Sequence, residues 1–158
     1  FSAEEWARIA GSPIAAGIAV TAAEPSGLFG MLKESFSSAS ALAEAQQNQG
    51  AGELIKSVAA DLTSSETRSA VRANLDARFK GATRSDIKGR AIEELKAVGA
   101  LLDSKAPEDS AAFKAWLRGI AQRTAEAAKE GGFLGIGGVP VSPAETAALA
   151  ELDKALAA

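Results

Sequence analysis

Three side chains that many enzymes use as nucleophiles or proton carriers, those of His, Cys and Tyr, are missing from this chain. Its 158 residues include no His, Cys or Tyr. A histidine-assisted nucleophile, a cysteine nucleophile, a zinc finger and a haem-ligating histidine are therefore excluded. Ser85 and Lys88 do match the S-x-x-K spacing of serine acyl-transferring enzymes. The companion motifs S-D-N and K-T-G are absent, so we predict that Ser85 caps a helix instead.

Acidic residues are plentiful, and two of them could form a general acid–base pair. The candidates on expected helices are Glu93, Glu94, Glu126 and Glu130. A di-metal centre of the Glu-x-x-His type needs histidine, and a D-x-D-x-D-G calcium loop does not occur. We expect these acids to pair with Lys or Arg at the surface, and we predict no cofactor, no metal and no catalytic residue.

The most distinctive segment is 131–141, GGFLGIGGVPV, in which five glycines alternate with bulky apolar residues. It lacks the Lys-Ser/Thr of a phosphate-binding Walker loop and the G-x-G-x-x-G of a dinucleotide site. Three interpretations stay open: a loop packed into the protein, an apolar loop exposed for a partner or membrane, and phosphate binding. The candidate ligand- or partner-binding residues here are Phe133, Leu134, Ile136 and Gly137.

Two further aromatic residues are candidates for the same binding role. Phe29 lies in 27–32, whose Gly-Leu-Phe-Gly resembles the Gly-Phe-Leu-Gly of the glycine-rich segment. Trp116 could stack on a ligand, but it also falls on the apolar stripe of its expected helix, where a core position is the more common role.

Positive charge is concentrated between residues 66 and 90. Seven basic and three acidic residues make this stretch about +4, whereas the chain as a whole is −3. Residues 77–91 faintly resemble the start of a helix-turn-helix. The candidate nucleic-acid-binding residues are Arg72, Arg84 and Arg90. The apolar stripe continues from Ile87 to Leu102 without the second turn that this motif needs. We therefore predict a solvated helix face and expect no nucleic-acid partner.

The elements that would position these residues are all predicted to be helices. Apolar residues recur at helical spacing, and alanine accounts for 37 residues. The expected helices cover 3–11, 13–24, 27–46, 84–104 and 107–130. Three more are expected: one from about Gly52, one between the cap cluster Thr63-Ser64-Ser65 with Glu66 and Gly81, and one that begins at Pro143. The fold class is therefore all-α: one domain, 1–158, forming a compact bundle of six to eight helices with short loops. Its N-terminal part, 1–25, combines a short helix with a buried one, and 131–142 is a glycine-rich apolar loop before the last helix.

Start and stop signals support these boundaries. Ser2 with Glu5 fits a capping box, and Ser12-Pro13 is typical of an N-cap followed by a first-turn proline. Gly81 follows a helix where a left-handed residue is expected. Pro107 and Pro143 each suit a first helical position.

No targeting or membrane segment is evident in the sequence. Residues 1–10 lack the basic-then-apolar order of a signal peptide. The longest uncharged run, 9–23, is too short and too weakly apolar for a membrane span. We expect a cytoplasmic location.

Two strings carry a resemblance to known proteins: AAGIAVTAAEPSGLFGML at 15–32 and KEGGFLGIGGVPVSPAE at 129–145. On these residues the chain resembles a family of small bacterial all-helical proteins with no assigned function. The resemblance implies a freestanding bacterial domain and brings no activity with it. We therefore expect a non-enzymatic helical binding or structural module that binds a protein partner or forms a homo-oligomer. The alternative is peripheral binding to membrane, lipid or an apolar ligand through 131–141.

Overall fold

The structure is a computed structural model that describes residues 1–22, 47, 52–130 and 143–157. Within these ranges the chain forms six helices and no strand, which confirms the all-α prediction. The helices are α1 (Ala3–Thr21), α4 (Glu53–Asp61), α5 (Ser65–Phe79), α6 (Arg84–Lys105), α7 (Pro107–Glu130) and α8 (Pro143–Ala157). Residues 23–46, predicted to hold another helix, and the 131–142 loop lie outside the described residues.

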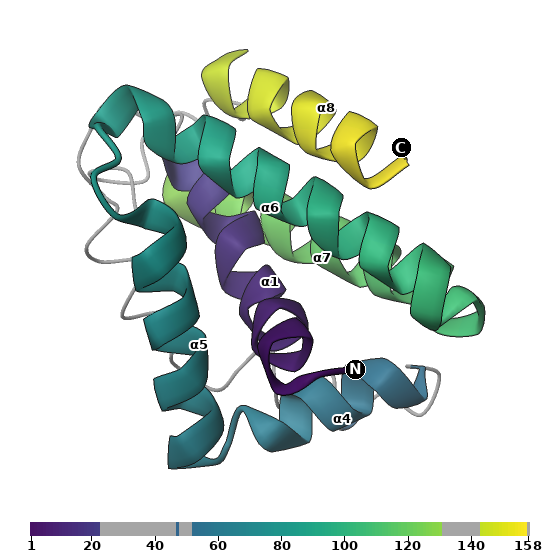
Figure 1. Cartoon of the computed structure of the whole chain (residues 1–158). Coiled ribbons are helices and arrows are strands. Elements are labelled where there is room, and N and C mark those ends of the chain that lie inside the picture. Colours follow the sequence, from purple (N-terminus) through teal and green to yellow (C-terminus); the bar gives the residue numbers. More distant parts are fainter. Residues whose placement is uncertain (23–46, 48–51, 131–142, 158) are drawn as a thin grey trace.

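The first helix, α1, runs through the middle of the molecule (Figure 1) and contacts each of the other five helices. Small residues dominate its buried positions, which include Ala10, Ala15, Ala16 and Ala19. Such residues let neighbouring backbones approach closely. Gly11 faces α5, where an added Cβ would lie 3.4 Å from Cγ1 of Val71, an ordinary van der Waals contact.

One predicted boundary is wrong. We expected a helix to end at Gly11 and a second to begin at Pro13, but α1 continues without a break through Ser12 and Pro13. Proline has no N–H, so the carbonyl of Ile9 loses its usual partner four residues on. The hydroxyl of the buried Ser12 donates to that carbonyl at 2.6 Å. The interior of α1 therefore tolerates Pro13 because Ser12 supplies the missing hydrogen bond.

The helices α6 and α7 form a pair beside α1, and α8 packs across both (Figure 1). The predicted stripe of α6 faces inward, with Ala91, Leu95, Val98 and Leu102 fully buried. On α7, Phe113 is fully buried and its ring meets Trp116 edge to face, with the centroids 5.3 Å apart. Trp116 is half-buried and packs against the core, as its stripe position predicted.

Most of the predicted helix ends are confirmed. Ser2 and Glu5 form the reciprocal capping box, and Ser64 caps α5. Gly81 has a φ of +70°, and α7 and α8 each begin at a proline. The start of α6 differs from our prediction for Ser85: Thr83 is the cap residue, and both its N–H and its hydroxyl donate to the carboxylate of Asp86.

The Ser12 bond can be tested by a double-mutant cycle. Ser12→Ala should lower the free energy of unfolding by about 1–3 kcal/mol, because it leaves the buried carbonyl of Ile9 without a partner. In a Pro13→Ala background the restored N–H of residue 13 can donate to that carbonyl. Ser12→Ala should then lower the free energy of unfolding by clearly less. Urea denaturation of the four proteins measures both values.

Thr124→Val is the matched control. The hydroxyl of Thr124 also donates to a carbonyl in its own helix, that of Ile120 at 2.8 Å. In Thr124→Val that carbonyl still accepts the backbone N–H of an unbroken helix. This substitution should therefore lower the free energy of unfolding by less than Ser12→Ala does. Equal costs of Ser12→Ala in the two backgrounds would contradict the role given to Ser12.

Candidate functional site

The candidate residues of the glycine-rich segment cannot be placed in the fold. Phe29, Phe133, Leu134, Ile136 and Gly137 lie outside the described residues. Their proposed role in binding a ligand or partner stays a prediction. Trp116, the remaining candidate of that group, is held against the core and keeps part of its surface accessible.

The three candidate phosphate-binding arginines do not share one environment. Arg72 is exposed on α5. Arg90 of α6 turns toward the end of α5, where its Nη1 donates to the carbonyls of Lys80 at 2.8 Å and Arg78 at 3.3 Å. Arg84 is the first residue of α6. At least one of the three therefore closes the C-terminus of a helix, a use that needs no nucleic acid.

Ser85 and Lys88, which match the S-x-x-K spacing, contact different partners. The hydroxyl of Ser85 hydrogen-bonds that of Thr83 at 3.0 Å. The Nζ of Lys88 pairs with Glu151 of α8 at 3.1 Å. The lysine therefore joins two helices and does not activate the serine.

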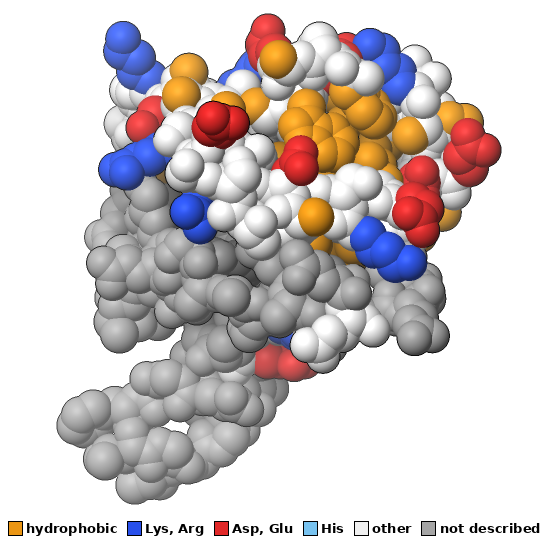
Figure 2. All heavy atoms as spheres, turned by 90° about the horizontal axis from the view of Figure 1, so that it is seen from below, with side chains coloured by type: hydrophobic (Ala, Val, Ile, Leu, Met, Phe, Trp, Pro, Cys, Tyr) orange, Lys and Arg blue, Asp and Glu red, His pale blue; other side chains and the backbone are white. Residues whose placement is uncertain are grey.

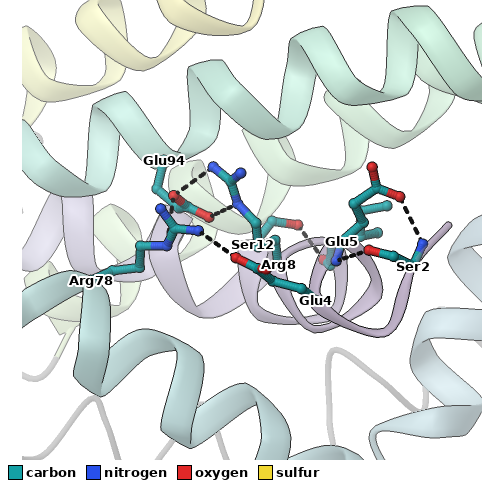
Figure 3. A network of polar contacts seen from close by, with 8 residues as sticks. Ser2, Glu4, Glu5, Arg8, Ser12, Arg78 and Glu94 are labelled. Atoms are coloured by element: carbon teal, nitrogen blue, oxygen red, sulfur yellow. Dashed lines mark hydrogen bonds and ion pairs between the residues drawn. The ribbon is translucent and has the colours of Figure 1, made fainter.

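A buried carboxylate, Glu94, lies at the meeting point of α1, α5 and α6 (Figure 3). Its side chain is 7% exposed. Arg8 of α1 binds it with two hydrogen bonds, Nε to Oε1 at 2.7 Å and Nη2 to Oε2 at 3.0 Å. Arg78 of α5 adds an ion pair at 3.7 Å and also reaches Glu4 at 3.4 Å. The hydrogen bond to Glu94 raises the pKa of Arg8.

This cluster is built to connect helices and not to move protons. Both oxygens of Glu94 are engaged by guanidinium groups, and arginine does not give up its proton near neutral pH. Two-pronged pairing also fixes the relative orientation of the two side chains. From the sequence we expected Glu94 to lie at the surface. A usable signal was present, because Glu94 follows Ala91 by three residues and precedes Val98 by four, on the apolar face of its helix.

Two smaller polar clusters join other helix pairs. Asp103 of α6 accepts a hydrogen bond from Lys114 of α7 at 2.6 Å and another from the buried hydroxyl of Ser110. These two bonds hold the pKa of Asp103 below its ordinary value of 3.8. Lys105 donates to both oxygens of Glu5 at 2.6 and 2.8 Å. That contact and the N–H of Ser2 lower the pKa of Glu5 from 4.5.

An aromatic pair lies at the start of α1. Phe1 is 46% exposed, and its ring centroid is 6.2 Å from that of Trp6. The indole N–H of Trp6 donates to Asp61, the last residue of α4, at 2.8 Å. Trp6 therefore ties the two helices together while its ring stays partly accessible.

The part of the chain that the structure describes contains no cluster of three or more acidic side chains that could hold a metal ion. Among the same residues, no helix has the length and hydrophobicity needed to cross a bilayer. Comparison with protein-family models, curated proteins and solved structures gave no match. The function therefore has to be inferred from the residues of this chain alone.

The Glu94 cluster predicts unequal effects of its members on stability. Glu94→Ala should lower the free energy of unfolding by about 3–5 kcal/mol, because it leaves the partly buried Arg8 without its partner. Arg78→Ala is the control: its side chain is 36% exposed, and its loss should cost less than about 1 kcal/mol. Denaturant unfolding measures both, and similar costs would contradict the bridging role of Glu94.

The lowered pKa values predict the direction of acid destabilisation. Asp103 and Glu5 stay ionised to lower pH in the folded protein than in the unfolded chain. The unfolded chain therefore binds more protons as the pH falls, so their contribution is complete above about pH 5.5 and is lost as pH falls through the folded pKa values. Glu5→Gln and Asp103→Asn should each flatten the fall in unfolding free energy between about pH 5.5 and 3. An unchanged slope in both variants would contradict this assignment.

Proposed function

We propose that this chain is a non-enzymatic helical interaction module that associates with a second copy of itself. The observation that carries the proposal is the position of α5. This helix packs on α1 and touches α6, and Val71 is its one buried residue. Its opposite face, which includes Ser69, Ala73 and Ala77, is exposed along its length. A helix of 15 residues covered on one side only offers a ready surface for another helix.

The use of charged residues supports binding over catalysis. Glu94, Asp103 and Glu5 each bridge two or more helices through cationic partners. Acids and bases that serve catalysis need an accessible reaction partner and a proton that can move. The acids of the described clusters are instead engaged by cationic partners from other helices.

The outer surface has a second feature that suits binding. Figure 2 shows one face on which hydrophobic side chains gather, with acidic and basic side chains around them. An apolar centre with a polar rim is the usual layout of a protein–protein interface.

A bacterial cytoplasmic location and membership of the small all-helical family are parts of this proposal that rest on the sequence. The alternative, lipid or membrane binding, depends on 27–32 and 131–141. Those segments lie outside the described residues, so the described surface adds no support to it.

Self-association is tested by light scattering on the whole chain. The apparent mass should rise above 16.0 kDa as the concentration increases over roughly a hundredfold range, because association follows mass action. The rise should shrink at high salt, since exposed charges contribute to the contact. A constant monomer mass over the whole range would overturn the proposal.

A further inference from the structure

We infer that two copies of this chain pair through the outer faces of their α5 helices, antiparallel, around a two-fold axis beside Ala73. This inference rests on the proposed self-association and specifies its geometry. In Figure 1, α5 lies at one edge of the group of described helices.

The outer face of α5 follows from helical spacing. Residues three or four apart share a face, which places Glu66, Ser69, Ala73, Ala77 and Lys80 opposite Val71. All five are exposed. The three central residues are small, so a second helix can approach closely along the middle of this face.

Among the described residues, Arg78 is the one charged residue of this helix that forms ion pairs, with Glu94 and Glu4. Glu66, Arg72, Asp76 and Lys80 are exposed and have no ion-pair partner in the part of the chain that the structure describes. The outer face itself carries one acid, Glu66, at its start and one base, Lys80, at its end, so it has no single sign of charge to repel its own copy.

An antiparallel arrangement pairs the charges at the two ends of the outer face. Residues at equal distances before and after Ala73 then face each other across the axis. Glu66 and Lys80 are equally far from Ala73, so Glu66 of each copy meets Lys80 of the other. Asp76 comes within one helical turn of Arg72 of the other copy. The symmetry produces each contact twice, as a two-fold interface requires.

A parallel arrangement has the opposite effect. It places Glu66 beside Glu66 and Lys80 beside Lys80, which is repulsive. It also aligns the two helix dipoles, whereas the antiparallel arrangement sets each positive N-terminus near a negative C-terminus. Charge complementarity therefore selects both the occupant of this face and its direction.

The expected contact is small. Two helices of this length bury an area at the low end of the range for specific interfaces, and exposed ion pairs add little energy each. The dimer should therefore be weak, reversible and sensitive to salt.

Cysteine cross-linking tests the position of the axis. The chain has no cysteine, so Ala73→Cys introduces one thiol per copy at the point where the two helices cross the axis. Disulfides form when the two Cα atoms are about 4.4–6.8 Å apart, a distance that closely packed helices reach. Under mild oxidation Ala73→Cys should give a covalent dimer at protein concentrations where Ala100→Cys, exposed on α6, remains monomeric. Equal cross-linking of the two variants would overturn the inferred axis.

Charge reversal tests the pairing itself. Glu66→Lys alone should weaken dimerisation by about tenfold or more, because each lysine then faces Lys80 of the other copy. Lys80→Glu should have a similar effect, and the double variant Glu66→Lys/Lys80→Glu should return the dissociation constant to within about threefold of the wild type. Glu93→Lys, exposed on α6, makes the same change in net charge elsewhere and should leave the constant nearly unchanged.

The outcomes separate this inference from the proposed function. Sedimentation equilibrium gives the dissociation constants, and circular dichroism shows whether each variant keeps its helices. A wild type that self-associates without rescue by the double variant contradicts the α5 pairing and leaves self-association standing. A wild type that remains monomeric at every concentration overturns both.

Discussion

The burial of α1 is the constraint on which the rest of the structure depends. Residues 9–13 of α1 are all buried, so their polar groups have no solvent to satisfy them and each must find a partner inside the protein. The side chains of α1 must also be small where neighbours are close, which explains the alanines and glycines of its sequence. The hydroxyl of Ser12 meets the first requirement beside Pro13, and the buried alanines, such as Ala15 and Ala16, meet the second.

Polar residues at the borders of this core set the angles between the helices. Apolar packing alone is non-directional, whereas the double bond between Arg8 and Glu94 holds α1 and α6 in one relative orientation. Lys105 with Glu5, and Trp6 with Asp61, do the same for neighbouring helix ends. A small set of directional contacts therefore determines which of many possible packings the bundle adopts.

The same organisation leaves α5 at the edge. Its apolar side chains suffice to cover one side of α1 but not to bury the helix itself, since Leu75 and Phe79 stay partly exposed. The outer face of α5 therefore forms part of the molecular surface. This is why we locate the interaction surface on α5 and not on the bridging clusters, whose groups already satisfy one another.

The sequence by itself determined the helices and most of their ends. Apolar spacing, Ser2, Ser64, Gly81 and the first-turn prolines act through contacts within a few residues, so they can be recognised without knowledge of the fold. Tertiary structure decided what those local signals could not. It kept α1 continuous through Pro13, because a buried helix interior favours a replacement hydrogen bond over a chain break. It also placed Glu94 inside, because Arg8, which binds it with two hydrogen bonds, comes from a helix far away in the chain and only folding brings the two residues together.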